Sequence, residues 1–202
     1  MSPPRMLPPA DYRAMPWKNG GGRTLEIRTE PPGADLVSFA WRVSIADIER
    51  DGPFSAFPGV DRTLVLLSGQ GMRLTGAGTP ILLEAPYEPV RFAGETAVHC
   101  ELVRGATRDF NLMVRRAQAR GAVLVVRDEA HAVPRAQAYA CYAAAGTSEC
   151  LVAGHPPIAV APEHTLLVDA DAAAHGMHVY PTSARSVALV AVIDGAARED
   201  RA

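Results

Sequence analysis

The sequence predicts an all-β protein, and three features support this prediction. Between Leu36 and Ile45, apolar side chains alternate with polar or small ones, which is typical of a strand with one buried face. Short apolar runs recur along the whole chain and are separated by turn residues. The 17 glycines and 17 prolines are spread over all 202 residues, as expected for many turns. This spacing indicates a sandwich or a barrel.

The first strands follow a glycine triplet. Residues 24–28 alternate like a strand. The next strand places Phe39, Trp41, Val43 and Ile45 on one face and Ala40, Arg42 and Ser44 on the other. We expect Trp41 to lie in the core and residues 47–50 to form a short helical turn.

Further strands are predicted in both halves of the chain. In the first half they cover residues 63–67, 72–75, 81–83, 90–92, 98–103 and 110–114. In the second half they cover residues 122–127, 137–142, 150–152, 164–168, 177–180 and 187–193. Residues 116–121 are basic and rich in small side chains, like a connector. We therefore expect two domains, residues 1–116 and 117–202.

The composition argues against several classes of partner. A net charge of −2 without a basic run gives no electrostatic footprint for nucleic acid. No apolar run is long enough to span a membrane, and the proline-rich start does not resemble a signal peptide. Three cysteines without a C-x-x-C spacing fit reduced thiols, and Cys100 lies in a strand pattern suited to burial. We expect a cytoplasmic protein that binds neither nucleic acid nor membrane.

Trp17, Lys18 and Asn19 stand directly before the glycine triplet, residues 20–22. Consecutive glycines are kept where the backbone needs a positive φ or passes close to another group. A phosphate-binding loop is excluded, because the lysine precedes the glycines and no helix follows them. The segment is either a ligand-binding loop or a plain turn with a solvated lysine.

The first half of the chain carries several distinctive motifs: Pro16-Trp17-Lys18-Asn19-Gly20-Gly21-Gly22, Trp41-Arg42-Val43-Ser44-Ile45-Ala46, Gly52-Pro53-Phe54-Ser55, Phe57-Pro58-Gly59, Asp61-Arg62-Thr63-Leu64 and Thr107-Arg108-Asp109-Phe110-Asn111-Leu112-Met113. These motifs resemble the HutD/Ves family of the cupin superfamily. The resemblance covers residues 15–116, and the second half is similar only in length and strand content. It implies a bicupin: a cupin barrel in residues 1–116 and a degenerate, jelly-roll-like cupin barrel in residues 117–202. It also implies a regulatory role in histidine utilisation, with N-formylglutamate as one candidate ligand.

The resemblance to cupins raises the question of a metal. Cupins commonly bind a divalent metal through histidines and a glutamate on neighbouring strands, but the corresponding segment, residues 58–69, contains no histidine. His175 and His178 are three residues apart, a spacing that brings two imidazoles together only on a helix. No serine or cysteine lies in a recognisable nucleophile elbow. We expect no metal, no other cofactor and no catalytic residue.

The remaining polar residues predict a pocket for a small anionic metabolite. Its candidate residues are Trp17, Lys18, Asn19, Arg42, Ser44, Arg62, Asp109 and Asn111. Asp109 and Asn111 share a face, because residues two apart on a strand point the same way. A guanidinium suits a carboxylate, and an Asn or Asp oxygen can accept from an amide or formyl N–H. A barrel of about eight strands can enclose one such ligand.

Two other functions stay open. The chain is an enzyme if Asp109 or Lys18 performs acid–base chemistry on a formylated or acylated amino acid. It is a structural or interaction protein, with a homodimer as one form, if the charges only hold the fold together. In that case Arg42 with Asp109, or Asp61 with Arg62, forms an ion pair at the rim.

Overall fold

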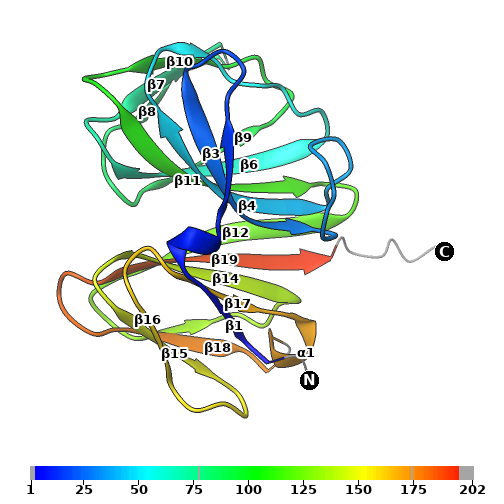
Figure 1. Cartoon of the computed structure of the whole chain (residues 1–202), viewed down its shortest axis with the longest axis vertical. Coiled ribbons are helices and arrows are strands. Elements are labelled where there is room, and N and C mark those ends of the chain that lie inside the picture. The colour runs from blue at the N-terminus through cyan, green and yellow to red at the C-terminus, as the bar shows by residue number, and fades with distance from the viewer. Residues whose placement is uncertain (1–2, 77, 174, 196–202) are drawn as a thin grey trace.

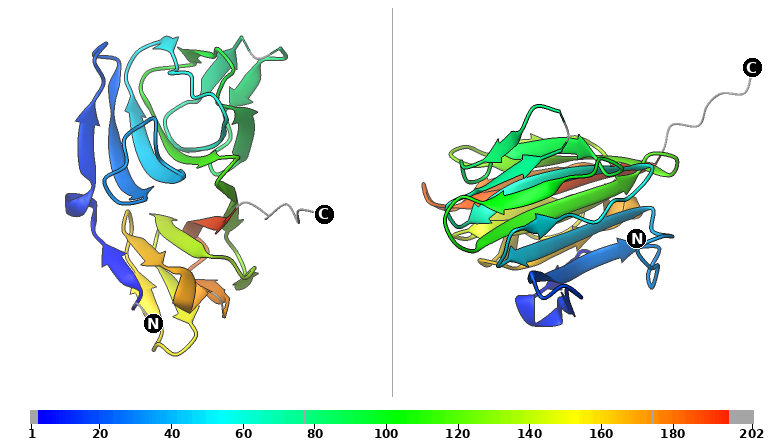
Figure 2. Two further views of the ribbon diagram at one scale, coloured as in Figure 1. Left: turned by 90° about the vertical axis from the view of Figure 1, so that its right-hand side faces the viewer. Right: turned by 90° about the horizontal axis from the view of Figure 1, so that it is seen from above.

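In the computed structural model, which describes residues 3–76, 78–173 and 175–195, four antiparallel sheets stack one after another along the long axis (Figures 1 and 2). Helical structure is limited to η1 (Pro9–Asp11) and α1 (Ala170–Ala173) in this part of the chain. Neither is long or apolar enough to pass through a bilayer. The prediction of an all-β protein is confirmed.

The first half forms two of the sheets. The first outer sheet has the order β5 (Gly52–Pro53), β10 (His99–Leu102), β7 (Met72–Thr75) and β8 (Ile81–Leu83). The first central sheet has the order β2 (Arg13–Pro16), β3 (Gly22–Glu30), β4 (Trp41–Ile48), β11 (Thr107–Arg115), β6 (Val60–Ser68) and β9 (Pro89–Ala93). A hydrophobic layer that includes Leu64, Leu66, Leu74 and the buried Cys100 lies between them.

The second half repeats this arrangement with two further sheets. The second central sheet has the order β1 (Arg5–Leu7), β17 (Thr165–Val168), β14 (Ala138–Ala145), β19 (Val187–Gly195) and β12 (Ala119–Val126). The second outer sheet has the order β13 (His131–Val133), β18 (Met177–Pro181), β15 (Ser148–Val152) and β16 (Ile158–Val160). Strand β12 begins inside the expected connector.

The expected pair of closed barrels is not confirmed. Among the described residues, the hydrogen-bonded ladders form four separate open sheets, and no ladder joins the two sheets of either half. The sheets of each half instead face one another across a layer of apolar side chains, as in a sandwich.

The strand that the alternation predicts is β4, and its faces are as expected. Trp41, Val43 and Ile45 lie in the core between the two central sheets, whereas Arg42 and Ser44 point to the other side. Phe39 differs from the prediction: it precedes β4 and packs with Val60 and Met113 in a small separate cluster. The expected helical turn at residues 47–50 is wrong, because β4 continues to Ile48 along β3.

The N-terminal segment joins the two halves. Strand β1 pairs with β17 of the second central sheet, and the chain then continues into β2 of the first central sheet (Figure 1). Between them, the Tyr12 hydroxyl donates to the backbone oxygen of Glu163 at 2.6 Å and lies 2.7 Å from the Thr165 hydroxyl. The division into domains at residues 116 and 117 stays a prediction.

Candidate functional site

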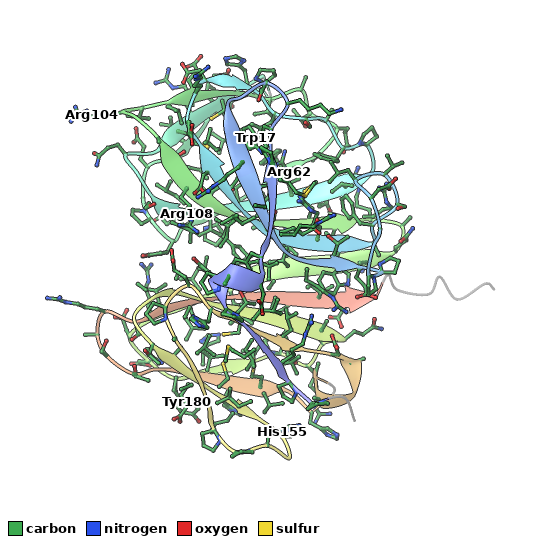
Figure 3. The ribbon with its side chains drawn as sticks, viewed as in Figure 1. Trp17, Arg62, Arg104, Arg108, His155 and Tyr180 are labelled. Carbon is green, nitrogen blue, oxygen red and sulfur yellow. The ribbon has the colours of Figure 1, made fainter. Side chains whose placement is uncertain are left out.

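A cavity of about 600 Å³ opens in the first half, between the first central sheet and the loops that follow β2 and β5. All eight candidate residues line it: Trp17, Lys18, Asn19, Arg42, Ser44, Arg62, Asp109 and Asn111. Figure 3 shows Trp17 and Arg62 in this half, whereas His155 and Tyr180 lie in the other half. The structure thus brings together residues from four separate parts of the sequence.

The floor of the cavity is one face of three neighbouring strands. On β11, Asn111 lies opposite Ser44 of β4, and Met113 lies opposite both Arg42 of β4 and Arg62 of β6. Because side chains alternate along a strand, the residues between them turn to the opposite face and join the core between the central sheets. The same alternation of side chains therefore places apolar residues in this core and the polar residues of the three strands in the cavity.

Arg62 is the buried cation of the site that has no acidic partner among the described residues. Its side chain lies among three phenyl rings, with Cζ 5.1 Å from the centroid of Phe54, 5.8 Å from Phe57 and 5.2 Å from Phe92. The residue is 6% exposed, its Nε has no hydrogen-bond partner, and it forms no ion pair within the described residues. Burial lowers the pKa of Arg62 to about 10, although the neighbouring Asp109 carboxyl opposes this shift.

Asp109 is the most enclosed acid. It is 1% exposed, and neither carboxyl oxygen has a hydrogen-bond partner among the described residues. Burial raises the pKa of Asp109 to about 7; Arg62 opposes the shift, and the charge of Asp47 adds to it. Asp109 is therefore poised between its neutral and charged forms near neutral pH.

Arg42 is neutralised by an acid that sequence reasoning did not identify. Its Nε donates to Glu26 Oε2 at 2.8 Å, and the Nη2 of Arg13 donates to the other oxygen of Glu26 at 2.7 Å. Burial raises the pKa of Glu26, but its hydrogen bonds, led by that from Arg42, outweigh burial and leave it below its ordinary value. The expected pair between Arg42 and Asp109 does not form.

The other ion pair expected at the rim is also absent. Asp61 pairs with Arg116, with 2.5 Å between its Oδ1 and the arginine Nη1. Arg62, its neighbour in sequence, turns into the cavity instead. Neighbouring residues on a strand point to opposite faces, which explains the separation.

The glycine loop forms one wall of the cavity. The Trp17 indole N–H donates to the Thr24 hydroxyl at 2.9 Å, and Asn19 Oδ1 accepts from the Gly21 N–H at 3.0 Å. Gly20 has a φ of +66°, which favours glycine. Lys18 is exposed. The segment is thus a turn with an exposed lysine and also a wall of the cavity.

Comparison with known proteins identifies the family. The model of the HutD family matches residues 9–185. The chain belongs to the HutD family. The match extends well beyond the motifs in residues 15–116 and includes most of the second half.

Two relatives support the assignment to the HutD family, which is associated with histidine utilisation. An uncharacterized 21.2 kDa protein in the hutC 3′ region of Pseudomonas putida is 50% identical over 113 residues, 56% of this chain and 59% of that protein. Protein Ves of Cronobacter sakazakii is 39% identical over 140 residues, 67% of this chain and 75% of that protein. The chain therefore matches less than two thirds of the length of the Pseudomonas putida relative.

Solved structures show the same fold. HutD from Pseudomonas fluorescens SBW25, described as a formate condition, is 32% identical with a TM-score of 0.80, over 96% of this chain and 99% of that one. A conserved protein of unknown function from Pseudomonas aeruginosa PAO1 is 30% identical with a TM-score of 0.83, over 96% and 100%. Oxalate decarboxylase of Bacillus subtilis is 9% identical with a TM-score of 0.60, over 95% and 77%, a likeness of fold alone. The chain therefore has a cupin-like fold.

The sequence did not identify the aromatic rings around Arg62 or the acid that pairs with Arg42. Phe54, Phe57 and Phe92 enclose Arg62, and Glu26 holds Arg42. Phe54 and Phe57 stand in family motifs next to prolines and a glycine, which is the signal that could have identified them. Phe92 and Glu26 lie on strands without any local signal.

The cavity holds a buried polar set that the described residues leave without hydrogen-bond partners. Atoms without a hydrogen-bond partner include Ser44 Oγ, Arg62 Nε, both carboxyl oxygens of Asp109 and Asn111 Oδ1. Buried polar groups are nearly always hydrogen-bonded, so such a set indicates a place for a polar molecule. Across residues 3–76, 78–173 and 175–195, no three His, Cys, Asp or Glu side chains are grouped to hold a metal ion.

Proposed function

We propose that this HutD-family chain binds a small carboxylate metabolite in the cavity and thereby regulates histidine utilisation. N-formylglutamate is the candidate ligand. The observation that supports the proposal most strongly is the buried Arg62, which has no ion-pair partner among the described residues. A buried unpaired charge is costly to the fold, and a bound carboxylate would neutralise it.

The remaining groups suit the rest of such a ligand. Asn111 Oδ1 and the Ser44 hydroxyl have no hydrogen-bond partner among the described residues, so the N–H of an amide or of a formamide group could donate to them. The rings of Phe54 and Phe57 would cover the apolar part of the ligand, and Lys18 could attract a second carboxylate at the rim. We also propose that the chain is a bicupin, with a cupin half in residues 1–116 and a degenerate cupin half in residues 117–202, in which hydrogen bonds do not close the barrels.

A thermal-shift panel tests the proposal. Histidine, urocanate, N-formylglutamate, glutamate and formate are each titrated into the protein. A ligand that binds only the folded chain raises the melting temperature, and a concentration of about 100 Kd adds roughly 2.7 kcal/mol of stability. We expect N-formylglutamate to give the largest shift. No shift with any of the five compounds would contradict the proposal.

The variant Arg62→Met distinguishes an effect on ligand binding from an effect on the stability of the free protein. Methionine fills much of the same apolar space, so we expect the ligand-induced shift to disappear. At about pH 6, where the Asp109 carboxyl is mostly neutral, we expect the melting temperature of the free protein to stay the same or rise. Arg91→Met is the matched control: Arg91 is an exposed arginine of β9 and does not line this cavity. It should leave the shift unchanged.

A second candidate function is supported by Asp109. A buried carboxyl with a pKa of about 7 in a cavity is suited to general acid–base catalysis. On this view the chain is an enzyme that acts on a formylated or acylated amino acid. Product formation from N-formylglutamate, lost in Asp109→Asn, would support this function over regulation by binding.

A cytoplasmic location and a homodimer also belong to the proposal. The three cysteines, Cys100, Cys141 and Cys150, are buried free thiols, which suits a reducing compartment. Each of the four sheets ends in open edge strands, which could pair with a second copy. Sedimentation of the purified chain measures the oligomeric state.

A further inference from the structure

The enclosed charges of the cavity balance only while it is empty, if the exposed cations Arg13 and Lys18 are left out of the sum. Arg42 forms an ion pair with Glu26 at 2.8 Å, and Arg13 forms a second ion pair with the same carboxylate. Of the described residues that line the cavity, Arg62 and Asp109 are then the remaining enclosed charges: one cation and one acid, which form no ion pair with each other. An anionic ligand that pairs with Arg62 would leave the Asp109 carboxylate as an uncompensated buried charge.

We propose that Asp109 determines the specificity of the site by holding a proton when the ligand binds and donating its O–H to the ligand carboxylate. This inference rests on the proposed binding of a carboxylate. It makes one proton part of the binding reaction: the proton comes from solvent and forms an O–H bond on the Asp109 carboxyl, and no bond of the ligand is broken. Arg62 and Asp109 then hold the ligand carboxylate from two sides. A carboxylic acid that donates to a carboxylate forms a short, charge-assisted hydrogen bond.

The groups that face Asp109 support the uptake of one proton by its carboxyl. From β6, Arg62 favours the charged form, whereas from β4, Asp47 favours the neutral form. From β10, Cys100 faces the same acid, and burial raises its pKa to about 12, so it stays a neutral thiol. None of these neighbours supplies a second cation to Asp109.

Two further arginines near this region are already engaged. Arg108, next to Asp109 on β11, lies with its Nε 3.5 Å from Asp47 Oδ1 and its Nη1 3.2 Å from Glu163 Oε1 (Figure 3). Arg115 donates to the backbone oxygen of Phe39 at 3.0 Å. Lys18 is exposed at the rim. Protonation of Asp109 is therefore the change that keeps the enclosed part of the site neutral.

Calorimetric titrations test the inference with N-formylglutamate and with formate. Both probes stay ionised between about pH 6 and pH 8.5, because ordinary carboxyl pKa values lie near 4. Binding and protonation are linked reciprocally, so above about pH 7 we expect Kd to rise about tenfold per pH unit. Repeating the titrations in buffers of different ionisation enthalpy counts the protons, and we expect uptake to approach about one at pH 8.5.

Asp109→Asn removes the titratable carboxyl but keeps a hydrogen-bond donor at the same position. Its amide can still donate to the ligand, so we expect a Kd that does not change with pH and no proton uptake. The matched control is Asp61→Asn. Asp61 lies on β6 next to Arg62 in sequence but faces away from this cavity and pairs with Arg116. This control should keep the pH dependence of the wild type.

The outcomes separate this inference from the proposed function. Binding of either probe with a pH-independent Kd and no proton uptake by the wild type would overturn the inference and leave the proposed function standing. A folded Asp109→Asn variant that binds neither probe at any pH would also overturn it, because the hydrogen-bond donor is still present. Failure of the wild type to bind either probe across the pH range would contradict the proposed function and, with it, the inference.

Discussion

At the scale of single residues, the buried charged groups of this site lower the stability of the folded protein. Arg62 and Asp109 are almost fully buried and do not neutralise each other by direct contact, an arrangement that weakens the fold of the empty protein. Three phenyl rings offset part of this penalty at Arg62. Such a sacrifice of stability is typical of functional sites.

The stability of the ligand-free protein should depend on pH through Asp109. Its pKa is about 7 in the folded chain, and an unfolded Asp has a pKa of about 3.9. The folded state therefore binds more protons, so the free energy of unfolding decreases as pH rises from about 4 to about 7 and then levels off. Asp109→Asn should remove this decrease and raise the free energy of unfolding at pH 8 by roughly 1–4 kcal/mol.

Urea unfolding of both proteins at several pH values between about 4 and 8 measures this difference. Asp61→Asn is again the control, because Asp61 is half-exposed. An identical pH dependence in the wild type and Asp109→Asn would show that Asp109 has an ordinary pKa.

The residues of the cavity were predictable where strand alternation decides the direction of a side chain. The alternation separates Arg42 and Ser44 from the core residues Trp41 and Val43, and the structure confirms this separation. The partner of Arg42 was not predictable, because Glu26 lies on another strand and only the register of β3 against β4 brings it close. Whether these residues hold a ligand stays a prediction.

At the scale of elements, the pairing of β3 with β4 fixes the glycine loop. Gly22 lies opposite Ile48, and Arg23 Nε pairs with Asp47 Oδ2 at 2.7 Å. A helical turn at residues 47–50 was a reasonable expectation from the local sequence. It is wrong because the ladder with β3 offers these residues more hydrogen bonds than an isolated turn.

Gly22→Ala should disrupt the base of this loop. A Cβ at residue 22 would lie 2.1 Å from the backbone oxygen of Asp47, so the strands must separate locally. We expect a loss of roughly 1–3 kcal/mol in the free energy of unfolding. We also expect weaker binding of N-formylglutamate, because Trp17 and Lys18 would move.

Thermal unfolding with and without N-formylglutamate measures both effects. Gly52→Ala is the matched control, because no described residue other than its two chain neighbours comes within 4 Å of a Cβ at that glycine, and its φ is compatible with alanine. Equal behaviour of the two variants would show that the close approach at Gly22 does not determine the loop.

At the scale of the whole molecule, the largest shared core lies between the two halves. The hydrophobic layer between the central sheets joins Val43, Ile45 and Phe110 of the first half to Tyr142 and Leu189 of the second. The rings of Phe110 and Tyr142 stack with centroids 5.8 Å apart. This layer indicates that the two halves unfold together.

The order of the four sheets was only partly predictable from the sequence. Local patterns predicted most strands of both halves, and the family resemblance implied two similar halves. The place of β1 was not predictable, because its partner β17 lies near the other end of the chain and Arg5–Leu7 carries no clear alternation. Short edge strands such as β5 and β16 are too brief to give a periodic signal.

Val179→Ala should destabilise both halves equally. Val179 is buried between the second central and second outer sheets. Both tryptophans belong to other hydrophobic clusters: Trp17 packs against the core of the first half, and Trp41 lies in the layer between the two central sheets. Loss of its methyl groups should lower the free energy of unfolding by roughly 1.5–3 kcal/mol. If the halves unfold as one unit, the midpoint measured by tryptophan fluorescence should fall by the same amount as that measured by far-UV circular dichroism.

Val37→Ala, at a side chain that is 80% exposed, is the control and should shift neither midpoint. An unchanged tryptophan midpoint beside a shifted circular-dichroism transition would instead show that residues 1–116 unfold as an independent domain.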